Sequence, residues 1–245
     1  GSPTTCYRVQ YAALYWGAML KSTDGSRANI AKIKLKLPGA TTYNTITGQL
    51  IYDAITAPIP APVKSGPIEN PNTPYACYAE VTSLLNGLSS LSGTYTVADV
   101  IASQGSNQST GLSAGWTLFV IYEDPSLHMK SFTVFDGFSY IDDSHFTLIP
   151  VSGFITPPSG PVDLQFAYAT LDGDKPKGGT KLEIGSKEVT TPLRPANNFF
   201  ISTIENTNGV QTPRNPSGSN TLGYDTGALE IKGADPEYIK NNQSS

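Results

Sequence analysis

Alternation of apolar and polar residues along much of the chain predicts β-strands. It is clearest over residues 30–37, where Lys32, Lys34 and Lys36 alternate with isoleucine and leucine. A period of two places the three lysines on one strand face, which we expect to face solvent. Weaker patterns of the same kind predict strands at residues 7–17, 41–52, 94–101, 131–135, 162–169, 199–202 and 221–231.

Residues 115–122 are apolar at nearly every position and are followed by Pro125. A short run that is apolar on both faces predicts a central strand buried between two layers. Farther on, Gly185 and Ser186 separate two short β patterns, which predicts a two-residue hairpin of the type that begins with glycine. The best helix pattern covers residues 78–88 and ends near Gly87.

Many short strands with one short helix predict an all-β fold, an antiparallel β-sandwich or jelly roll. Charged residues make up 15% of the chain, below the roughly 25% of an average soluble domain, and 23 glycines and 19 prolines favour turns. Composition changes nowhere sharply enough to divide the chain, so we expect a single module over residues 1–245. Its last ten residues are polar, and we expect them to be flexible or truncated.

Charge and hydropathy exclude two classes of partner. The net charge is −4, and no cluster of basic residues is present that would neutralise nucleic-acid phosphates. No apolar stretch reaches the roughly 18 residues of a membrane span, so we expect no membrane insertion.

Cys6 and Cys77 are the only cysteines. They are either a disulfide, closing a loop of about 70 residues worth roughly 4 kcal/mol, or two buried free thiols. We predict the disulfide, because the other features of the chain favour an oxidising compartment. Sequence does not give the Cβ geometry that would decide between the two.

One long segment and five shorter ones resemble a recurring pattern in large secreted bacterial surface proteins. The long segment is AGWTLFVIYEDPSLHMKSFTVFDGF (residues 114–138). The shorter segments are AALYWGA (12–18), YACYAEVTSLL (75–85), GTYTVADV (93–100), GFITPPSGPV (153–162) and NTLGYDTG (220–227). Their order also matches, and such modules occur in adhesin-like chains that include gliding-motility adhesins of the Bacteroidetes.

The resemblance implies an extracellular, cell-surface β-sandwich without a known catalytic activity. We therefore expect a non-catalytic module of a large adhesin or filament protein, in surface attachment or structural display. Its partners would be a surface glycan, a protein ligand or neighbouring modules of the same chain. The family often carries Asp-x-Asp after LGYD, whereas this chain has Asp225-Thr-Gly, which leaves a metal role there doubtful.

Catalytic constellations are sparse. A catalytic triad requires a histidine, and His128 and His145 both lie in turn-like sequence. Glu123 and Asp124 follow the apolar run and would suit a pair of catalytic carboxylates, but an Asp-Pro-Ser turn explains them more simply. We expect no enzymatic activity.

Calcium is the one cofactor that the sequence suggests. Asp172 and Asp174 flank a glycine in a loop after a predicted strand, and hard cations bind such closely spaced carboxylates. A solvated turn is the alternative. These two aspartates are the candidate metal ligands.

Aromatic residues support a second function, that of a carbohydrate-binding module or glycan-active hydrolase. The chain has 13 tyrosines and two tryptophans, which offer flat surfaces to sugar rings. We expect Trp116 in the core. Trp16, beside Gly17 at an expected strand end, is the candidate ligand-binding aromatic. A core position is the alternative for Trp16.

Overall fold

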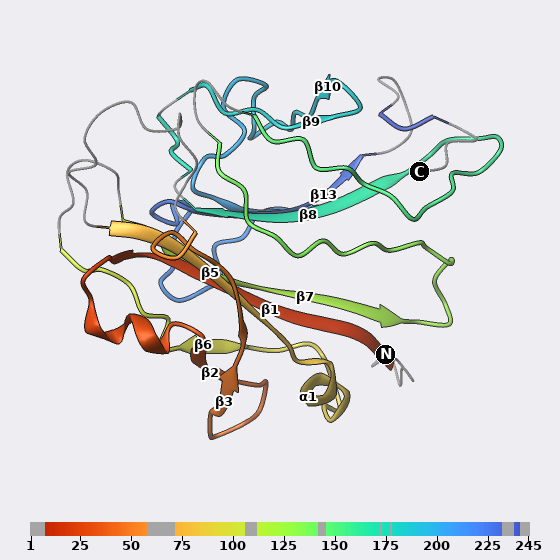
Figure 1. The fold of residues 1–245 in the computed structure, drawn as a ribbon. Helices are drawn as coiled ribbons and strands as arrows, with labels where there is room; N and C mark the ends of the chain where they lie inside the picture. Colours follow the sequence, from red (N-terminus) through yellow and green to blue (C-terminus); the bar gives the residue numbers. More distant parts are fainter. Residues whose placement is uncertain are drawn as a thin grey trace. The chain divides into compact units, whose positions relative to one another are not determined.

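The computed structural model describes residues 8–57, 72–105, 112–141, 146–171, 173–176, 178–231 and 238–240. Almost all regular structure in this part is β, which confirms the predicted fold class (Figure 1). The chain forms two compact units, where the sequence analysis expects one module over 1–245. Unit 1 comprises residues 1–130 and 136–138, and unit 2 comprises residues 131–135 and 139–245.

Unit 1 contains two antiparallel sheets. The larger has the strand order β4-β5-β1-β7 and the smaller has the order β3-β2-β6. The larger consists of β1 (Arg8–Lys21), β4 (Gln49–Asp53), β5 (Asn72–Glu80) and β7 (Ala114–Glu123). The smaller consists of β2 (Lys32–Lys36), β3 (Asn44–Thr47) and β6 (Thr96–Ala98).

The two sheets of unit 1 share one hydrophobic core, which makes the unit a sandwich. From β1 it receives every second side chain, and from β2 it receives Ile33 and Leu35. The three lysines that alternate with these residues stay outside, and Lys34 pairs with Asp99 at the surface (Nζ–Oδ2 2.9 Å). The alternation at residues 30–37 therefore predicted both faces of β2. The buried members are Val9, Ala12, Leu14, Trp16, Ala18, Leu20, Ile30, Ile33, Leu35, Ile46, Tyr75, Cys77, Ala79, Val81 and Leu85.

The two inner strands of the larger sheet are β5 and β1, and the prediction that residues 115–122 form a central strand is wrong. β1, red in Figure 1, lies between β5 and β7, whereas β7 pairs only with β1 among the described strands. Residues on β7 are consequently half-buried, and Tyr122 is 47% exposed. β1 also runs through Gly17, where we expected a strand to end.

The expected helix at residues 78–88 is shorter than its pattern. Residues up to Glu80 belong to β5, and only α1 (Thr82–Asn86) is helical. Leu85 of α1 is buried in the core, and residues of β5 face the same core. The apolar spacing that predicted one longer helix therefore combines strand residues with helix residues. A short 3-10 helix, η1 (Gly25–Asn29), precedes β2.

Unit 2 contains a four-stranded sheet of order β12-β11-β13-β8 and a hairpin formed by β9 and β10. The strands are β8 (Leu164–Leu171), β9 (Glu183–Ile184), β10 (Lys187–Glu188), β11 (Ile204–Asn206), β12 (Gly209–Val210) and β13 (Tyr224–Ile231). The pair β11–β13 is parallel. The hairpin lies where the sequence predicted it, but φ is positive at both Gly185 (58°) and Ser186 (70°). Its turn is therefore of type I′ and not of the predicted type that begins with glycine.

The core of unit 2 is aromatic. Phe199 and Phe200 are buried with Val189 and Leu229, and the ring of Tyr168 packs against both phenylalanines. Residues 199–202 belong to no described strand, and Ser202 has a positive φ of 51°, so the predicted strand there is wrong. All four residues are nevertheless buried. Residues 131–135 likewise form no described strand.

Part of the C-terminal segment that we expected to be flexible or truncated packs onto unit 2. The Tyr238 hydroxyl donates to the backbone carbonyl of Glu188 (2.9 Å), and the Thr156 hydroxyl donates to the carbonyl of Lys240 (2.7 Å). Residues 236–237 and 241–245 lie outside the described residues.

Candidate functional site

Unit 2 contains a buried guanidinium, that of Arg194, which has no solvent exposure. Its Nε donates to Oε2 of Glu205 (2.6 Å), and its terminal nitrogens lie 2.9 and 3.1 Å from the two carboxylate oxygens of Asp225. It also donates to the backbone carbonyls of Phe199 (2.7 Å) and Thr203 (3.0 Å). One cation thus bonds two buried carboxylates and two carbonyls from separate segments, which offsets the desolvation of all three charges.

Asp225 lies on β13, inside the segment NTLGYDTG. It is fully buried, and its Oδ2 also accepts a hydrogen bond from the backbone N–H of Ile201 (2.5 Å). Burial raises the pKa of Asp225, and the Arg194 guanidinium acts in the opposite direction. Asp225 therefore joins β13 to the Arg194 network, and this contact gives it a structural role.

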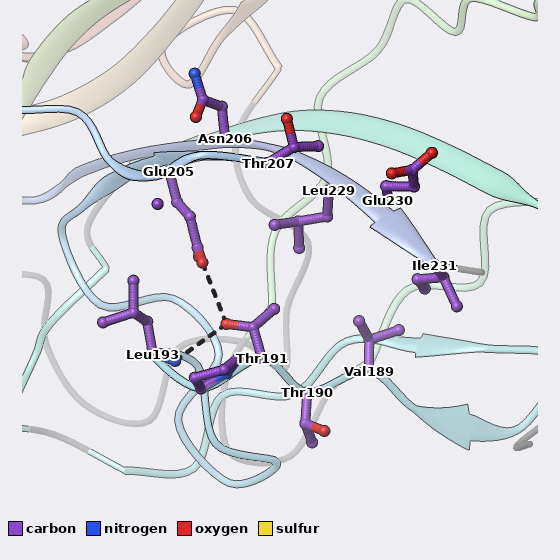
Figure 2. Close-up of a pocket in the computed structure, with 12 residues that line it drawn as sticks. Val189, Thr190, Thr191, Leu193, Glu205, Asn206, Thr207, Leu229, Glu230 and Ile231 are labelled. Atoms are coloured by element: carbon purple, nitrogen blue, oxygen red, sulfur yellow. Dashed lines mark hydrogen bonds between the residues drawn. The ribbon is translucent and has the colours of Figure 1, made fainter. Parts of the chain in front are cut away.

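A pocket of about 440 Å³ lies beside this network (Figure 2). Figure 2 shows Glu205 directed toward Thr191, whose hydroxyl donates to Oε1 of Glu205 at 3.4 Å. The same hydroxyl accepts the backbone N–H of Leu193 (3.2 Å). The pocket is lined by Val189, Thr190, Thr191, Pro192, Leu193, Glu205, Asn206, Thr207, Gly209, Leu229, Glu230 and Ile231.

The pocket combines apolar walls with a carboxylate that already accepts hydrogen bonds. Val189, Leu229 and Ile231 give it apolar walls. The carboxylate of Glu205 already accepts from Arg194 and Thr191, and Glu205 is only 6% exposed. A carboxylate held in this way lacks the freedom of a general base.

Unit 1 presents an aromatic cluster on the face of its larger sheet that points away from the core. The rings of Tyr15 and Tyr78 are stacked with centroids 5.7 Å apart, and Phe119 meets Tyr15 edge-on at 5.5 Å. The hydroxyl of Tyr78 lies 3.4 Å from Oε1 of Gln49. All three rings are half-buried. Stacked aromatics with polar edges are a surface on which sugar rings or apolar side chains bind.

The segment Asp136–Phe138 belongs to unit 1 and contacts this sheet at two places. The hydroxyl of Tyr15 donates to Oδ1 of Asp136, and Phe138 stacks on Tyr52 with ring centroids 4.3 Å apart. Burial raises the pKa of Tyr15, and the hydrogen bond to Asp136 raises it further. Asp136 and Phe138, from the resembling segment, thus pack against the larger sheet of unit 1.

Trp16, the candidate ligand-binding aromatic, lies in the core, so the expectation of an exposed ring is wrong. It is 2% exposed, and its Nε1 donates to the backbone carbonyl of Ile30 (2.8 Å). Its neighbour across the strands is Trp116, which is half-buried and packs against the same core. The cause is the central position of β1: Gly17 does not end the strand but continues it.

The structure gives Cys77 as a free cysteine and does not support the expected bridge to Cys6. Cys77 is fully buried on β5, and its Sγ lies 3.7 Å from the carbonyl oxygen of Ile30. Burial raises the pKa of Cys77 to about 12. Cys6 lies outside the described residues, so the bridge stays a prediction.

The candidate calcium ligands are described only in part. Asp174 is exposed just before a turn at residues 175–176, and Asp172 lies outside the described residues. Within the residues that the structure describes, no cluster of three or more metal-ligating side chains is present. The calcium hypothesis therefore stays a prediction.

The acidic end of β7 has the geometry of a turn. Asp124 accepts hydrogen bonds from the backbone N–H (2.9 Å) and the hydroxyl (2.6 Å) of Ser126, which lower its pKa. Glu123 and His128 are exposed, and His145 lies outside the described residues. This arrangement matches the turn interpretation of Asp124.

Sequence reasoning missed Arg194 and Glu205. Arg194 is a lone basic residue in TPLRPAN, and its carboxylate partners lie 11 and 31 residues farther along the chain. A weak signal existed in the cationic residue placed just before the apolar run Phe199–Ile201, but only the fold gives its partners.

None of the helices in the described part of the chain has the length and apolarity needed to cross a bilayer. The resemblance noted in the sequence rests on the quoted segments alone. Comparison with models of known protein families, with curated proteins and with solved structures finds no match to this chain.

Proposed function

We propose that this chain is a non-catalytic, extracellular module of a large bacterial cell-surface adhesin or filament protein. In this role it attaches the cell or displays other modules. Its partners are a surface glycan, a protein ligand or neighbouring modules of the same chain.

The Arg194 network is the observation that carries this proposal. Glu205 and Asp225 are a pair of buried carboxylates of the kind that could have worked as acid and base. Both are bonded to one guanidinium inside the core of unit 2, and Asp225 comes from one of the resembling segments. The long resembling segment also has a structural role, in unit 1. It forms β7 and supplies Asp136, which accepts a hydrogen bond from Tyr15. These segments thus contribute to packing, which supports a module for surface attachment or structural display.

Surface labelling tests the proposal. Antibodies raised against the purified protein are applied to intact cells of the producing strain, with a cytoplasmic protein as the matched control. We expect labelling of intact cells and weaker attachment of a deletion strain to surfaces. Labelling that requires permeabilisation would overturn the proposal.

The stacked tyrosines favour a second candidate, a carbohydrate-binding module. Tyr15 and Tyr78 form a half-buried aromatic pair beside the polar side chain of Gln49. A glycan array on the intact protein tests it, with Tyr78→Ala compared with Tyr43→Ala. Tyr43 is exposed beside Lys36, away from the pair, and is the matched control. Sugar binding predicts loss of signal in Tyr78→Ala alone; an array without bound glycans would remove this candidate.

A further inference from the structure

The chain contains two Asn-Gly pairs in contrasting settings, Asn86-Gly87 and Asn208-Gly209. Asparagine followed by glycine is the dipeptide most prone to deamidation, because glycine has no side chain to obstruct attack by its backbone nitrogen. Both asparagines are exposed, so solvent access does not distinguish them. Their backbones and side-chain contacts do.

Asn86 is held in an unreactive arrangement. It is the last residue of α1, and Gly87 continues in right-handed helical geometry (φ −79°, ψ −7°). Its side-chain oxygen accepts the backbone N–H of Val9 (3.0 Å), and its side-chain nitrogen donates to the carbonyl of Val9 (3.1 Å). Ring closure would break both hydrogen bonds and distort the end of the helix.

Asn208 has neither restraint. It lies in the turn between β11 and β12, and Gly209 has φ +98°. Its backbone N–H donates to the side chain of Asn206 (2.8 Å), but its own amide makes no hydrogen bond within the described residues. No atom beyond its chain neighbours lies within 4 Å of the position of a Cβ on Gly209, and Asn208 is exposed, so the chain is not packed against other segments at this turn.

We propose that Asn208 is a site of spontaneous deamidation and that Asn86 is protected. The backbone nitrogen of Gly209 loses its proton and forms a bond to Cγ of Asn208. The bond from Cγ to the side-chain nitrogen breaks, and ammonia leaves with that proton. Water then opens the cyclic imide at one of its two carbonyls and yields aspartate or isoaspartate.

The product changes the pocket of unit 2. Asn206, Thr207 and Gly209 line that pocket together with Glu205 and Glu230. A carboxylate at position 208 adds one negative charge beside two existing acids. Isoaspartate also lengthens the backbone inside the hairpin, which disturbs the hydrogen bonds of the Gln211 side chain to Asn206 (2.9 Å) and Gly209 (2.8 Å). The site therefore alters the charge of the pocket as the protein ages.

The test compares the two Asn-Gly pairs within one molecule. The intact protein is incubated at mildly alkaline pH and physiological temperature, with circular dichroism to verify that it stays folded. Peptide mass mapping and enzymatic methylation of isoaspartate then measure conversion at each site. We expect at least about tenfold more product at Asn208, the factor that follows from breaking two hydrogen bonds at Asn86.

Denaturation supplies the control. In urea the two sites have the same dipeptide and no fold, so we expect their conversion to become similar. Equal conversion in the folded protein, faster conversion at Asn86, or an unreactive Asn208 would each overturn the proposal. Asn208→Ser, which has no amide to lose, confirms the assignment of the product.

Discussion

The indole nitrogen of Trp16 donates a hydrogen bond to the backbone carbonyl of Ile30, 2.8 Å away. Trp16 belongs to β1, an inner strand of the larger sheet, and Ile30 lies just before β2 of the opposing sheet. The bond therefore connects the two layers of unit 1 through their core, where a buried carbonyl needs a donor.

Trp16→Phe removes this donor and shrinks the ring. We expect a loss of about 1–3 kcal/mol in the free energy of unfolding, because the carbonyl of Ile30 keeps only the weak thiol donor of Cys77 (3.7 Å) inside the core. Urea denaturation measures it. Trp116→Phe, on the half-buried neighbouring strand, is the matched control and should cost less. Equal losses would show that the bond to Ile30 contributes nothing.

The indole ring of Trp16 leaves no room for a side chain at position 48, which is a glycine. A Cβ at this position would lie 2.3 Å from the Trp16 indole and 2.5 Å from the carbonyl oxygen of Tyr78. Gly48→Ala should lower the free energy of unfolding by about 1–3 kcal/mol, since a buried indole and a strand backbone cannot move freely. Gly25→Ala is the control because no atom surrounds its Cβ position. Similar stability for the two variants would contradict this packing.

Arg194→Met leaves Glu205 and Asp225 buried without their cation. We expect a loss of about 3–5 kcal/mol, which thermal and urea unfolding at neutral pH would measure. Lys181→Met, which breaks the exposed pair with Glu188 in the same unit, is the control and should leave stability almost unchanged. A small effect of Arg194→Met would mean that the two acids find other partners.

The loss in free energy of unfolding caused by Arg194→Met, called the deficit below, should depend on pH. Burial raises the pKa of Asp225, and removal of Arg194 takes away the opposing effect. When folding raises the pKa of a carboxyl, the protonated carboxyl stabilises the folded state at pH values below the pKa of the unfolded chain. This stabilisation is lost as pH rises through the pKa of the folded protein. The deficit should therefore be largest at neutral pH and shrink in mild acid. A constant deficit across this range would contradict it.

The Cys77 thiol should resist alkylation in the folded protein. Burial raises its pKa from 9.0 to about 12, so the thiolate is scarce near pH 9. Its contribution to stability is present below pH 9 and is lost between pH 9 and about 12. We expect alkylation of Cys6→Ser protein to be at least about tenfold slower when folded than in urea. Equal rates would place Cys77 at the surface.

Thiol counting tests the expected Cys6–Cys77 bridge in the wild-type protein. Unfolded without reductant, a bridged protein gives no titratable thiol. The free Cys77 of the structure instead predicts a titratable thiol, and a second one if Cys6 is also reduced.

Calcium at Asp172 and Asp174 predicts a stabilised native state. An ion that binds only the folded protein, with an affinity near roughly 10⁻⁴ to 10⁻³ M, raises the melting midpoint as its concentration passes that value. Melting curves in millimolar calcium and in chelator, for wild type and Asp174→Ala, measure the shift. An unchanged wild-type midpoint would leave the aspartates as turn residues.

The sequence predicted elements whose pattern is local. The alternation around Lys34 gave both faces of β2, and Gly185-Ser186 gave the β9–β10 hairpin, because strand pleating and positive φ depend on neighbouring residues. It did not predict which apolar strand is central. β1 and β7 are apolar on both faces, and only the number of partner strands separates Trp16 in the core from Trp116 near the edge.

The candidate site was harder to predict because its members are distant in sequence. Arg194 reaches carboxylates on β11 and β13, and no spacing rule connects an arginine to acids so far along the chain. The resembling segment NTLGYDTG drew attention to Asp225, and its departure from the family's Asp-x-Asp pattern argued against a metal role there. Its burial beneath a guanidinium is a property of the fold.

The central position of β1 has a consequence for how the chain is made. β1 is the earliest described strand, yet Trp16 pairs with Cys77 on one side and with Trp116 on the other. Pairings over such separations form slowly, and unpaired apolar strands aggregate. A ribosome or export channel that releases the chain from its N-terminus delivers this strand long before its neighbours. Chaperones that hold nascent chains would therefore have their greatest effect on the strand that ends up at the middle of the finished sheet.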